Sequence, residues 1–365
     1  MTHDPHASGS THHEHSRLKP GHHEAKHHAH PELHPTAMPY SAVIAGTGFY
    51  VPEKILTNDD MMKLVDTSDE WITERTGMKE RRMARPDEAT SDMAFEAARK
   101  ALADADTKAA DLDAIVVGTV TGDYHFPSTA CLLQDRLGAK HAAAMDVSAG
   151  CTGFLYALET ARHFVMSGSY RNVLVVGAEL LTRIVDWTDR GTCVLLGDGA
   201  GAAVIRPTAE RNRGIVAGHF GADGSRKEDL WLPAGGSRLP ASEATLRDRR
   251  HYLLMNGNAI FKVAVRAMAH TTTELLHKIG AKPEDVKLLI PHQANLRIIE
   301  AVARQLKFGM DRVYVNIHKY ANTSSATIPI ALDEARREGR IRPGDLVILV
   351  AFGAGLTWGG VAIRW

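Results

Sequence analysis

The chain has 365 residues, of which 44% are hydrophobic and 24% charged. These proportions are typical of a soluble globular protein, and the length allows one large or two similar domains. The 43 basic residues balance 43 acidic residues, so no overall charge indicates a nucleic-acid or membrane partner. Three cysteines supply neither a disulfide framework nor a paired metal motif, and there is no apolar run of membrane-spanning length and no signal peptide. We therefore expect a cytoplasmic protein without a metal site.

The first 40 residues differ in composition from the rest of the chain. Eleven histidines lie between His3 and His34, among proline, glutamate, lysine and serine. Such a segment cannot bury enough apolar surface to offset the entropy of ordering, so we expect a disordered tail over residues 1–40. Imidazole groups can bind Zn²⁺, Ni²⁺ or Cu²⁺ weakly, but composition alone does not support a physiological metal site here.

From residue 41 onward, apolar segments of strand length alternate with segments of helical periodicity. The strand segments are residues 42–45, 114–117, 143–147, 173–176, 202–205, 287–290, 312–317, 346–350 and 360–363. The helical segments are residues 91–103, 128–137, 152–166, 259–279, 296–306 and 325–338. This alternation predicts an α/β fold. The order strand, turn, helix, strand around Cys151 also recurs around Asn322, which suggests a duplicated fold with one site between the halves.

Cys151 lies between a predicted strand and a predicted helix, in the segment DVSAGCTGF. The free N–H groups and the dipole of a helix N-terminus favour a thiolate, so we expect this thiol to ionise readily and to attack an acyl group. Most free cysteines are instead buried packing residues, which is our interpretation of Cys131 and Cys193. Taken alone, Cys151 fits either description.

Two polar residues occur at similar junctions later in the chain. His292 lies just past the strand at 287–290, and Asn322 follows the predicted strand at 312–317. The crevice beyond the carboxyl ends of strands is where open α/β sheets bind ligands. A structural histidine and a turn asparagine are the simpler interpretation of each residue alone. Three such junctions together favour a shared site with Cys151.

These segments together resemble β-ketoacyl-acyl-carrier-protein synthase III. The resemblance rests on DVSAGCTGF around Cys151, PHQANLRI around His292, NTSSATIP from Asn322, and the glycine-rich residues 189–202 and 351–359. It covers residues 41–365. It implies a thiolase-like fold, in which two similar βαβαβαββ halves, at 41–212 and 213–365, form a five-layered αβαβα sandwich.

The resemblance also implies a decarboxylative condensation of acetyl-CoA with malonyl-acyl-carrier protein (ACP), which starts fatty-acid synthesis. Cys151 would carry the acyl group, His292 and Asn322 would complete a catalytic triad, and the backbone N–H groups of Cys151 and Ala354 would form the oxyanion hole. No cofactor is implied, because the CoA thioester is a substrate. Residues implied in binding CoA and pantetheine are Trp71, Arg75, Arg190, Gly257, Asn258, Ala294 and Asn295.

The same resemblance implies two protein partners. Phe126 and Phe352 would line the acyl pocket, and Phe126 would reach the partner subunit of a homodimer. An acidic carrier protein would dock on a basic helix surface, although an ordinary solvated helix face is an equally simple interpretation. Residues implied in docking are Lys262, Arg266, Gln293 and Arg297, with Arg304 and Lys307 beside them.

Related enzymes remain as alternatives. Residues 352–360 lack the second cysteine of degradative thiolases, and Asn322 stands where elongating synthases have a second histidine. Synthases of secondary metabolism that use longer or aromatic acyl-CoA primers share the Cys-His-Asn set, although their terminal loop often reads Gly-Phe-Gly-Pro-Gly rather than Ala-Phe-Gly-Ala-Gly. An inactive homologue that only binds acyl-CoA or ACP is the alternative of another class.

Overall fold

The computed structural model describes residues 40–210 and 212–365, so the predicted tail lies outside the described residues except for Tyr40. One sheet has five strands in the order β1-β7-β6-β4-β5, and another has four in the order β11-β12-β13-β8. The strands of the first are β1 (Ser41–Tyr50), β4 (Ala114–Gly118), β5 (Ala143–Val147), β6 (Val173–Leu180) and β7 (Asp198–Thr208). Those of the second are β8 (Gly214–Ala222), β11 (Val286–Pro291), β12 (Leu346–Gly353) and β13 (Thr357–Arg364).

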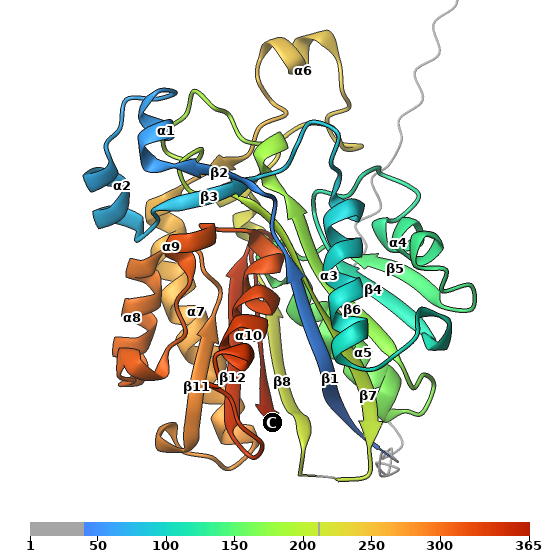
Figure 1. Cartoon of the computed structure of the whole chain (residues 1–365). Helices are drawn as coiled ribbons and strands as arrows, with labels where there is room; N and C mark the ends of the chain where they lie inside the picture. Colours follow the sequence, from blue (N-terminus) through green and yellow to red (C-terminus); the bar gives the residue numbers. More distant parts are fainter. Residues whose placement is uncertain (1–39, 211) are drawn as a thin grey trace, which may run out of the picture. The chain divides into compact units, whose positions relative to one another are not determined.

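Helices pack on the outer faces of both sheets and between them (Figure 1). Helices α3 and α4 pack on the five-stranded sheet, α5 and α10 contact strands of both sheets, α7 packs on the four-stranded sheet, and α8 packs on α7. Their bounds are α3 (Thr90–Asp104), α4 (Thr129–Leu137), α5 (Gly153–Met166), α7 (Gly257–Lys278), α8 (Leu296–Leu306) and α10 (Thr327–Arg337). The layer order is therefore the predicted αβαβα.

Strands β4, β6 and β12 are buried along their whole length, because helices cover both faces of each sheet. Between the sheets, Phe154 and Leu158 of α5 belong to the same buried cluster as Ile328 and Leu332 of α10. This shared core fixes the two turns that precede α5 and α10, where Cys151 and Asn322 lie.

The two sheets share one topology. The parallel pair β4 and β6 corresponds to β11 and β12, and the antiparallel strands β7 and β1 correspond to β13 and β8. Each inner helix follows a single turn of 3₁₀ helix, which is η2 (Gly150–Thr152) before α5 and η7 (Ser324–Ala326) before α10. The structure thus places Cys151 and Asn322 in equivalent turns, as the sequence pattern suggests.

The predicted strand at 312–317, the counterpart of β5, is wrong. This segment makes one isolated bridge, between Leu289 and Val313. The side-chain amide of Gln293 replaces further ladder bonds: its Nε2 donates to the Tyr314 carbonyl at 3.2 Å and its Oε1 accepts from the Asn316 N–H at 3.1 Å. The other eight predicted strands and all six predicted helices are confirmed, with ends that differ by a few residues.

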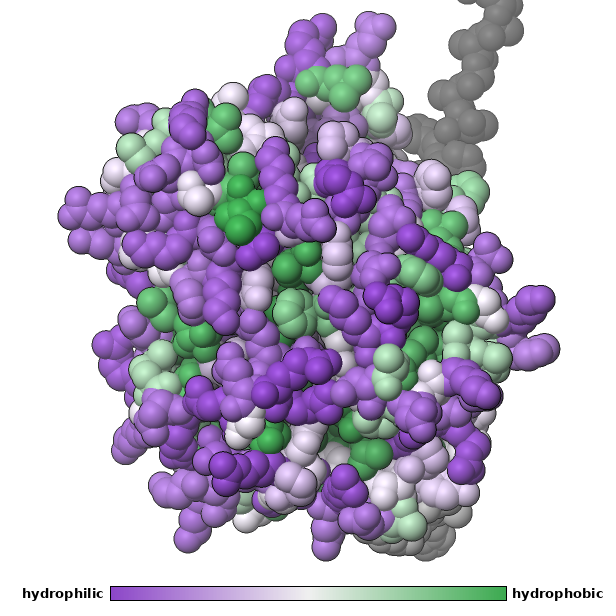
Figure 2. Space-filling view, in the orientation of Figure 1, coloured by the Kyte–Doolittle hydropathy of each residue, from purple (hydrophilic) through white to green (hydrophobic). Residues whose placement is uncertain are grey.

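The short elements α1 (Asn58–Met62), α2 (Asp69–Thr76), α6 (Glu243–Arg247), β2 (Lys54–Thr57) and β3 (Glu80–Met83) lie in the upper part of the view in Figure 1. The other short elements are β9 (Leu230–Trp231), β10 (Leu254–Met255) and α9 (Ile317–Tyr320). On the face drawn in Figure 2, polar side chains cover most of the surface and apolar side chains form small separate patches.

Candidate active site

One cavity of about 170 Å³ is lined by Cys151, His292 and Asn322 together. Most of its other lining residues are apolar, and they come from both halves of the chain; they include Leu181, Leu195, Leu196, Ile260, Met268 and Phe352. The structure therefore brings the three predicted catalytic residues to one apolar pocket, as their positions at strand-to-helix junctions suggest. Their chemical roles remain predictions.

The Cys151 turn packs backbone against backbone with the loop that follows β12. Gly150 has a φ of +54°, and a Cβ atom there would lie 2.9 Å from the backbone nitrogen of Ala354. A Cβ atom at Gly353 would lie 2.6 Å from the backbone nitrogen of Cys151. Only glycine permits this approach, which brings the N–H groups of Cys151 and Ala354 to the same sulfur atom. Ala354 itself keeps a negative φ, so alanine is tolerated there.

The Cys151 thiol does not ionise as readily as predicted. Burial in the apolar pocket raises its pKa to about 11, and the Ser324 hydroxyl and the two backbone N–H groups oppose this only in part. The predicted easy ionisation is wrong for the resting site, because desolvation outweighs the donors at the helix N-terminus. The thiol therefore needs a proton acceptor before it can attack.

His292 is 2% exposed, and burial lowers the pKa of its imidazole to about 3. The ring is therefore neutral at physiological pH. Its Nδ1 lies 2.7 Å from the hydroxyl of Thr327, the first residue of α10. A neutral imidazole has one donor and one acceptor nitrogen, so the partner of Nδ1 decides what Nε2 can do.

Asn322 is held at its side-chain oxygen and at its backbone, and its Nδ2 group remains a donor for the pocket. Its Oδ1 accepts the Ser324 N–H at 2.8 Å, and its backbone pairs with Leu195 and Gly197 on the neighbouring segment. The flanking Ala321 and Ser324 have φ values of 54° and 49°, which are unusual for residues other than glycine. Such conformations persist where the surroundings over-determine them, and they are common at functional sites.

Glu179, a buried carboxylate near the end of β6, is not among the predicted site residues. Its oxygens accept from the Thr121 hydroxyl at 2.5 Å, the Val120 N–H at 3.2 Å and the Ser324 hydroxyl at 3.1 Å. Burial raises its pKa to about 7. Glu179 therefore links the Asn322 turn to the loop after β4. The sequence does contain a signal for this residue, because Glu179 is the one charged residue in an otherwise apolar strand.

Trp71 in α2 has two arginines near its ring. The guanidinium carbons of Arg75 and Arg190 are each 5.1 Å from the centre of its ring. A nucleotide base between Trp71 and Arg190 needs about 7 Å, which is two van der Waals contacts of about 3.5 Å, so the Arg190 side chain must move to admit one. The three predicted nucleotide-binding residues thus form one cluster, in a closed arrangement.

This cluster adjoins the pocket through Asn295. Its side-chain amide donates to the Arg75 carbonyl at 3.0 Å, and Asn295 also lines the cavity, as do Ala294 and Gly257. Asn258 is exposed and does not line the cavity. Three of the four residues predicted for the pantetheine channel therefore lie where a chain from the cluster to Cys151 would pass.

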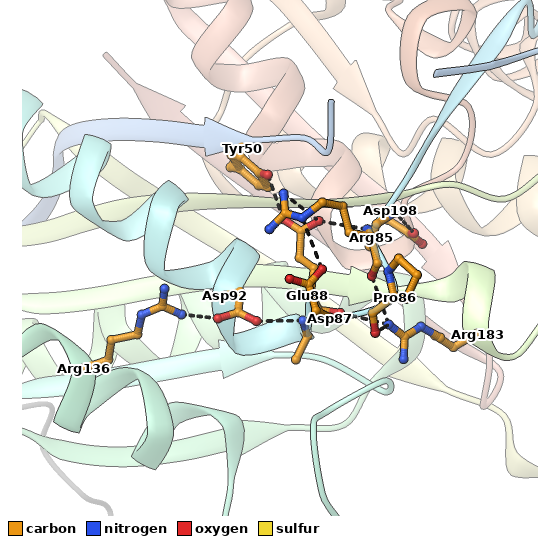
Figure 3. Close-up of polar contacts among 11 residues, drawn as sticks. Tyr50, Arg85, Pro86, Asp87, Glu88, Asp92, Arg136, Arg183 and Asp198 are labelled. Carbon is orange, nitrogen blue, oxygen red and sulfur yellow. Dashed lines mark hydrogen bonds and ion pairs between the residues drawn. The ribbon is translucent and has the colours of Figure 1, made fainter. Parts of the chain in front are cut away.

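Of the two predicted acyl-pocket residues, Phe352 lines the cavity and Phe126 does not. Phe126 is 86% exposed, on the loop between β4 and α4. The loop is anchored where Asp123 accepts both the N–H and the hydroxyl of Ser91, at 2.9 and 2.6 Å. The segment before Ser91 is itself held by Arg183, which donates to three backbone carbonyls of residues 85–88 (Figure 3).

The predicted docking residues fall into two groups. Lys262, Arg266 and Arg297 are exposed on the packed helices α7 and α8, as are Arg304 and Lys307. Gln293 is 1% exposed and its amide is used by backbone groups, so its predicted place on a docking surface is wrong. Cys193 is buried as predicted, whereas Cys131 is exposed on α4 and is not a packing residue.

The described residues, 40–210 and 212–365, lack two further features. None of their helices combines the length and apolar character needed to span a bilayer. No cluster of three or more His, Cys, Asp or Glu side chains in this part of the chain has the geometry of a metal site.

Comparisons with known proteins agree with this geometry. Residues 145–224 match the family model for 3-oxoacyl-[acyl-carrier-protein] synthase III, and residues 276–365 match the model for its C-terminal part. The β-ketoacyl-[acyl-carrier-protein] synthase III of Caldanaerobacter subterraneus subsp. tengcongensis is 57% identical over 89% of this chain and 98% of its own length.

Solved structures show the same relationship. The 3-oxoacyl-[acyl-carrier-protein] synthase III of Aquifex aeolicus is 50% identical, with a TM-score of 0.82 over 89% of this chain and all of that one. The priming β-ketosynthase of the R1128 polyketide pathway is 35% identical, with a TM-score of 0.83 over 89% of this chain and 96% of that one. The fold is that of the thiolase-like acyltransferases. The chain belongs to the β-ketoacyl-[acyl-carrier-protein] synthase III family, the condensing enzymes of fatty-acid synthesis.

Proposed function

We propose that the chain condenses acetyl-CoA with malonyl-ACP to give acetoacetyl-ACP, through an acetyl group carried on Cys151. The observation that carries this proposal is the pocket itself, where a cysteine, a neutral histidine and an asparagine with an anchored side chain meet. The reaction uses no cofactor, since both thioesters are substrates. The cytoplasm, where we expect the protein, supplies both.

In the first half-reaction, the Cys151 sulfur attacks the acetyl thioester and CoA leaves. The oxyanion that forms lies near the N–H groups of Cys151 and Ala354, and one such donor is typically worth about 3 kcal/mol of transition-state stabilisation. In the second half-reaction, malonyl-ACP loses CO₂, and the resulting enolate attacks the acetyl-Cys151 carbonyl. His292 and Asn322 donate to the enolate oxygen as its charge develops.

We further propose that a second copy of the chain covers the edge strand β5. Among the described residues only β4 pairs with β5, and Met145 on this strand is 37% exposed. An unpaired apolar edge is a ready surface for association. The anchored loop beside it presents Phe126 at 86% and Tyr124 at 65% exposure, so Phe126 is available to complete the acyl pocket of a partner subunit.

The carrier protein would dock on the exposed basic residues of α7 and α8. Lys262, Arg266, Arg297, Arg304 and Lys307 supply a local positive surface although the chain has no net charge. Such a surface steers an acidic partner and makes the association rate dependent on salt. The pocket lining includes Gly257, the first residue of α7, and Asn295, the N-cap of α8, and this supports docking on these two helices.

Intact-protein mass spectrometry tests the proposal. Acetyl-CoA should add one acetyl group to the wild type and to Cys131→Ala, but none to Cys151→Ala. Malonyl-ACP should then remove the adduct as acetoacetyl-ACP appears. An adduct formed only from longer or aromatic acyl-CoAs would instead support a synthase of secondary metabolism, like the polyketide-pathway relative. Absence of any adduct would support an inactive binding homologue.

A further inference from the structure

The hydroxyl of Thr327 lies between two buried groups that compete for its single proton. Its Oγ1 is 2.7 Å from His292 Nδ1 and donates to the Ser324 carbonyl at 2.9 Å. A hydroxyl has one proton and two lone pairs. While it donates to Ser324, it can only accept from His292, so the ring carries its proton on Nδ1 and presents an unprotonated Nε2.

The opposite arrangement is also open to this hydroxyl. If its proton turns toward Nδ1, the ring must carry its own proton on Nε2, which then becomes a donor. The Ser324 carbonyl is not left without a partner, because the backbone N–H of Thr327 also donates to it. Without this backbone donor, rotation of the hydroxyl would leave the buried Ser324 carbonyl without a hydrogen bond, which is costly. The two arrangements therefore differ in the direction of one hydroxyl and in which ring nitrogen carries the proton.

The two half-reactions of the proposed function need opposite properties at His292. The Cys151 thiol, whose pKa burial raises to about 11, needs an acceptor during acetylation. The enolate formed from malonyl-ACP needs a donor. Asn322 cannot serve both needs, because a side-chain amide is not a titratable base and cannot take the thiol proton.

We propose that Thr327 is a positioning residue that supports the Nδ1–H tautomer of His292 during acetylation and the Nε2–H tautomer during condensation. This inference rests on the proposed function. During acetylation the thiol proton passes to Nε2, the new S–C bond forms as the C–S bond to CoA breaks, and the CoA thiolate takes the proton.

During condensation the bond from the malonyl group to its carboxylate breaks, and its electron pair forms the enolate and then the new C–C bond. The C–S bond to Cys151 breaks, and the Cys151 thiolate takes a proton from water. The tautomers exchange between the half-reactions through protons of water.

Three variants separate this role from simple packing. Thr327→Val keeps the shape of the side chain and removes the hydroxyl, whereas Thr327→Ser keeps the hydroxyl. Thr272→Val is a matched control, because Thr272 is also buried and donates to a backbone carbonyl, that of Met268, at 2.9 Å, whereas the hydroxyl bonded to His292 is that of Thr327. Acetylation by acetyl-CoA and CO₂ release from malonyl-ACP are measured separately. Long-range ¹H–¹⁵N NMR reports the tautomer of His292, with His292→Gln used to assign its signals.

Thr327→Val should slow both half-reactions by at least about 10-fold. This is less than the roughly 10²-fold that a proton-transfer group itself contributes at minimum, because His292 remains in place. The wild type should show the Nδ1–H tautomer at rest, and Thr327→Val should lose this preference. Thr327→Ser and Thr272→Val should match the wild type in rate and spectrum.

Unchanged rates and tautomer signals in Thr327→Val, or a serine variant that behaves like valine, would overturn the inference. The NMR readout needs no turnover. A wild type that shows the Nδ1–H tautomer but never forms an acetyl adduct would therefore contradict the proposed function and not the hydroxyl–histidine coupling.

Discussion

The turns before α5 and α10 occupy equivalent places in the two sheets but present different chemistry. The Cys151 turn uses glycines at 150 and 353 to bring backbone N–H groups to a sulfur atom. The Asn322 turn has no glycine, and Ala321 and Ser324 adopt positive φ angles instead. A repeated fold therefore sets where the two turns lie, while local backbone conformation and side chains decide that one carries a nucleophile and the other a fixed donor.

The largest expected effect comes from filling the space beside the Cys151 turn. In Gly150→Ala the new Cβ atom would lie 2.9 Å from the Ala354 nitrogen and displace that N–H. Acetylation should fall by roughly 10²–10³, as for loss of one oxyanion-hole donor. Gly138→Ala is the matched control, since Gly138 has a φ of +71° but nothing within 4 Å of the added atom. It should cost about 1–3 kcal/mol of stability and leave acetylation intact; equal loss in both variants would contradict the account.

A smaller effect concerns Glu179, which joins the Asn322 turn to the opposite half. Its pKa is raised from 4.5 to about 7 by burial, so the folded protein binds this proton more tightly than the unfolded chain does. The contribution of this proton to the free energy of unfolding is complete below about pH 4.5 and is lost as the pH rises through about 7. At about 1.4 kcal/mol per pKa unit, the loss is on the order of 3 kcal/mol.

Glu179→Gln removes this titration and supplies the control. The free energy of unfolding of the wild type, minus that of the variant, should decrease between pH 4.5 and 8 in denaturant titrations. The subtraction matters because buried neutral His292, whose pKa is lowered to about 3, acts in the opposite sense as the pH falls below 6.5. A difference that is constant or rises with pH would show that Glu179 does not carry a raised pKa.

The smallest effect lies at the surface, away from both turns. Trp71→Ala should weaken binding of acetyl-CoA by about 1 kcal/mol, or roughly fivefold in KM, since a stacked aromatic contact near an exposed arginine is worth about that much. The rate at saturation should not change. An acetyl thioester of N-acetylcysteamine, which lacks the nucleotide, should react equally well with both proteins. If KM rose equally for both substrates, Trp71 would not contact the nucleotide.

The sequence predicts elements whose apolar pattern is strong, and the two misses among the strands of the two large sheets have long-range causes. Segment 312–317 has a strand pattern, but the amide of Gln293 takes its backbone groups. Strand β8 was missed because its glycines hide the pattern. A Cβ atom at Gly218 would strike Glu159, and one at Gly221 would strike Trp358, so tertiary contacts require these glycines.

The site was predictable in its members but not in its electrostatics. Cys151 and His292 stand in recognisable segments, and the structure brings them to one pocket. The raised pKa of Cys151 could not be predicted, because it depends on burial among residues distant in sequence. The same holds for Glu179 and for Thr327, whose partners are brought together only by the packing of the two halves.

The most direct test of the division between the two turns records acyl-enzyme formation and CO₂ release side by side in two variants. Asn322→Ala should form the acetyl adduct at the wild-type rate and release little CO₂ from malonyl-ACP. Cys151→Ala should form no adduct and still release CO₂. If both variants lose the same half-reaction, or if Asn322→Ala condenses at the wild-type rate, the two turns do not divide the chemistry in this way.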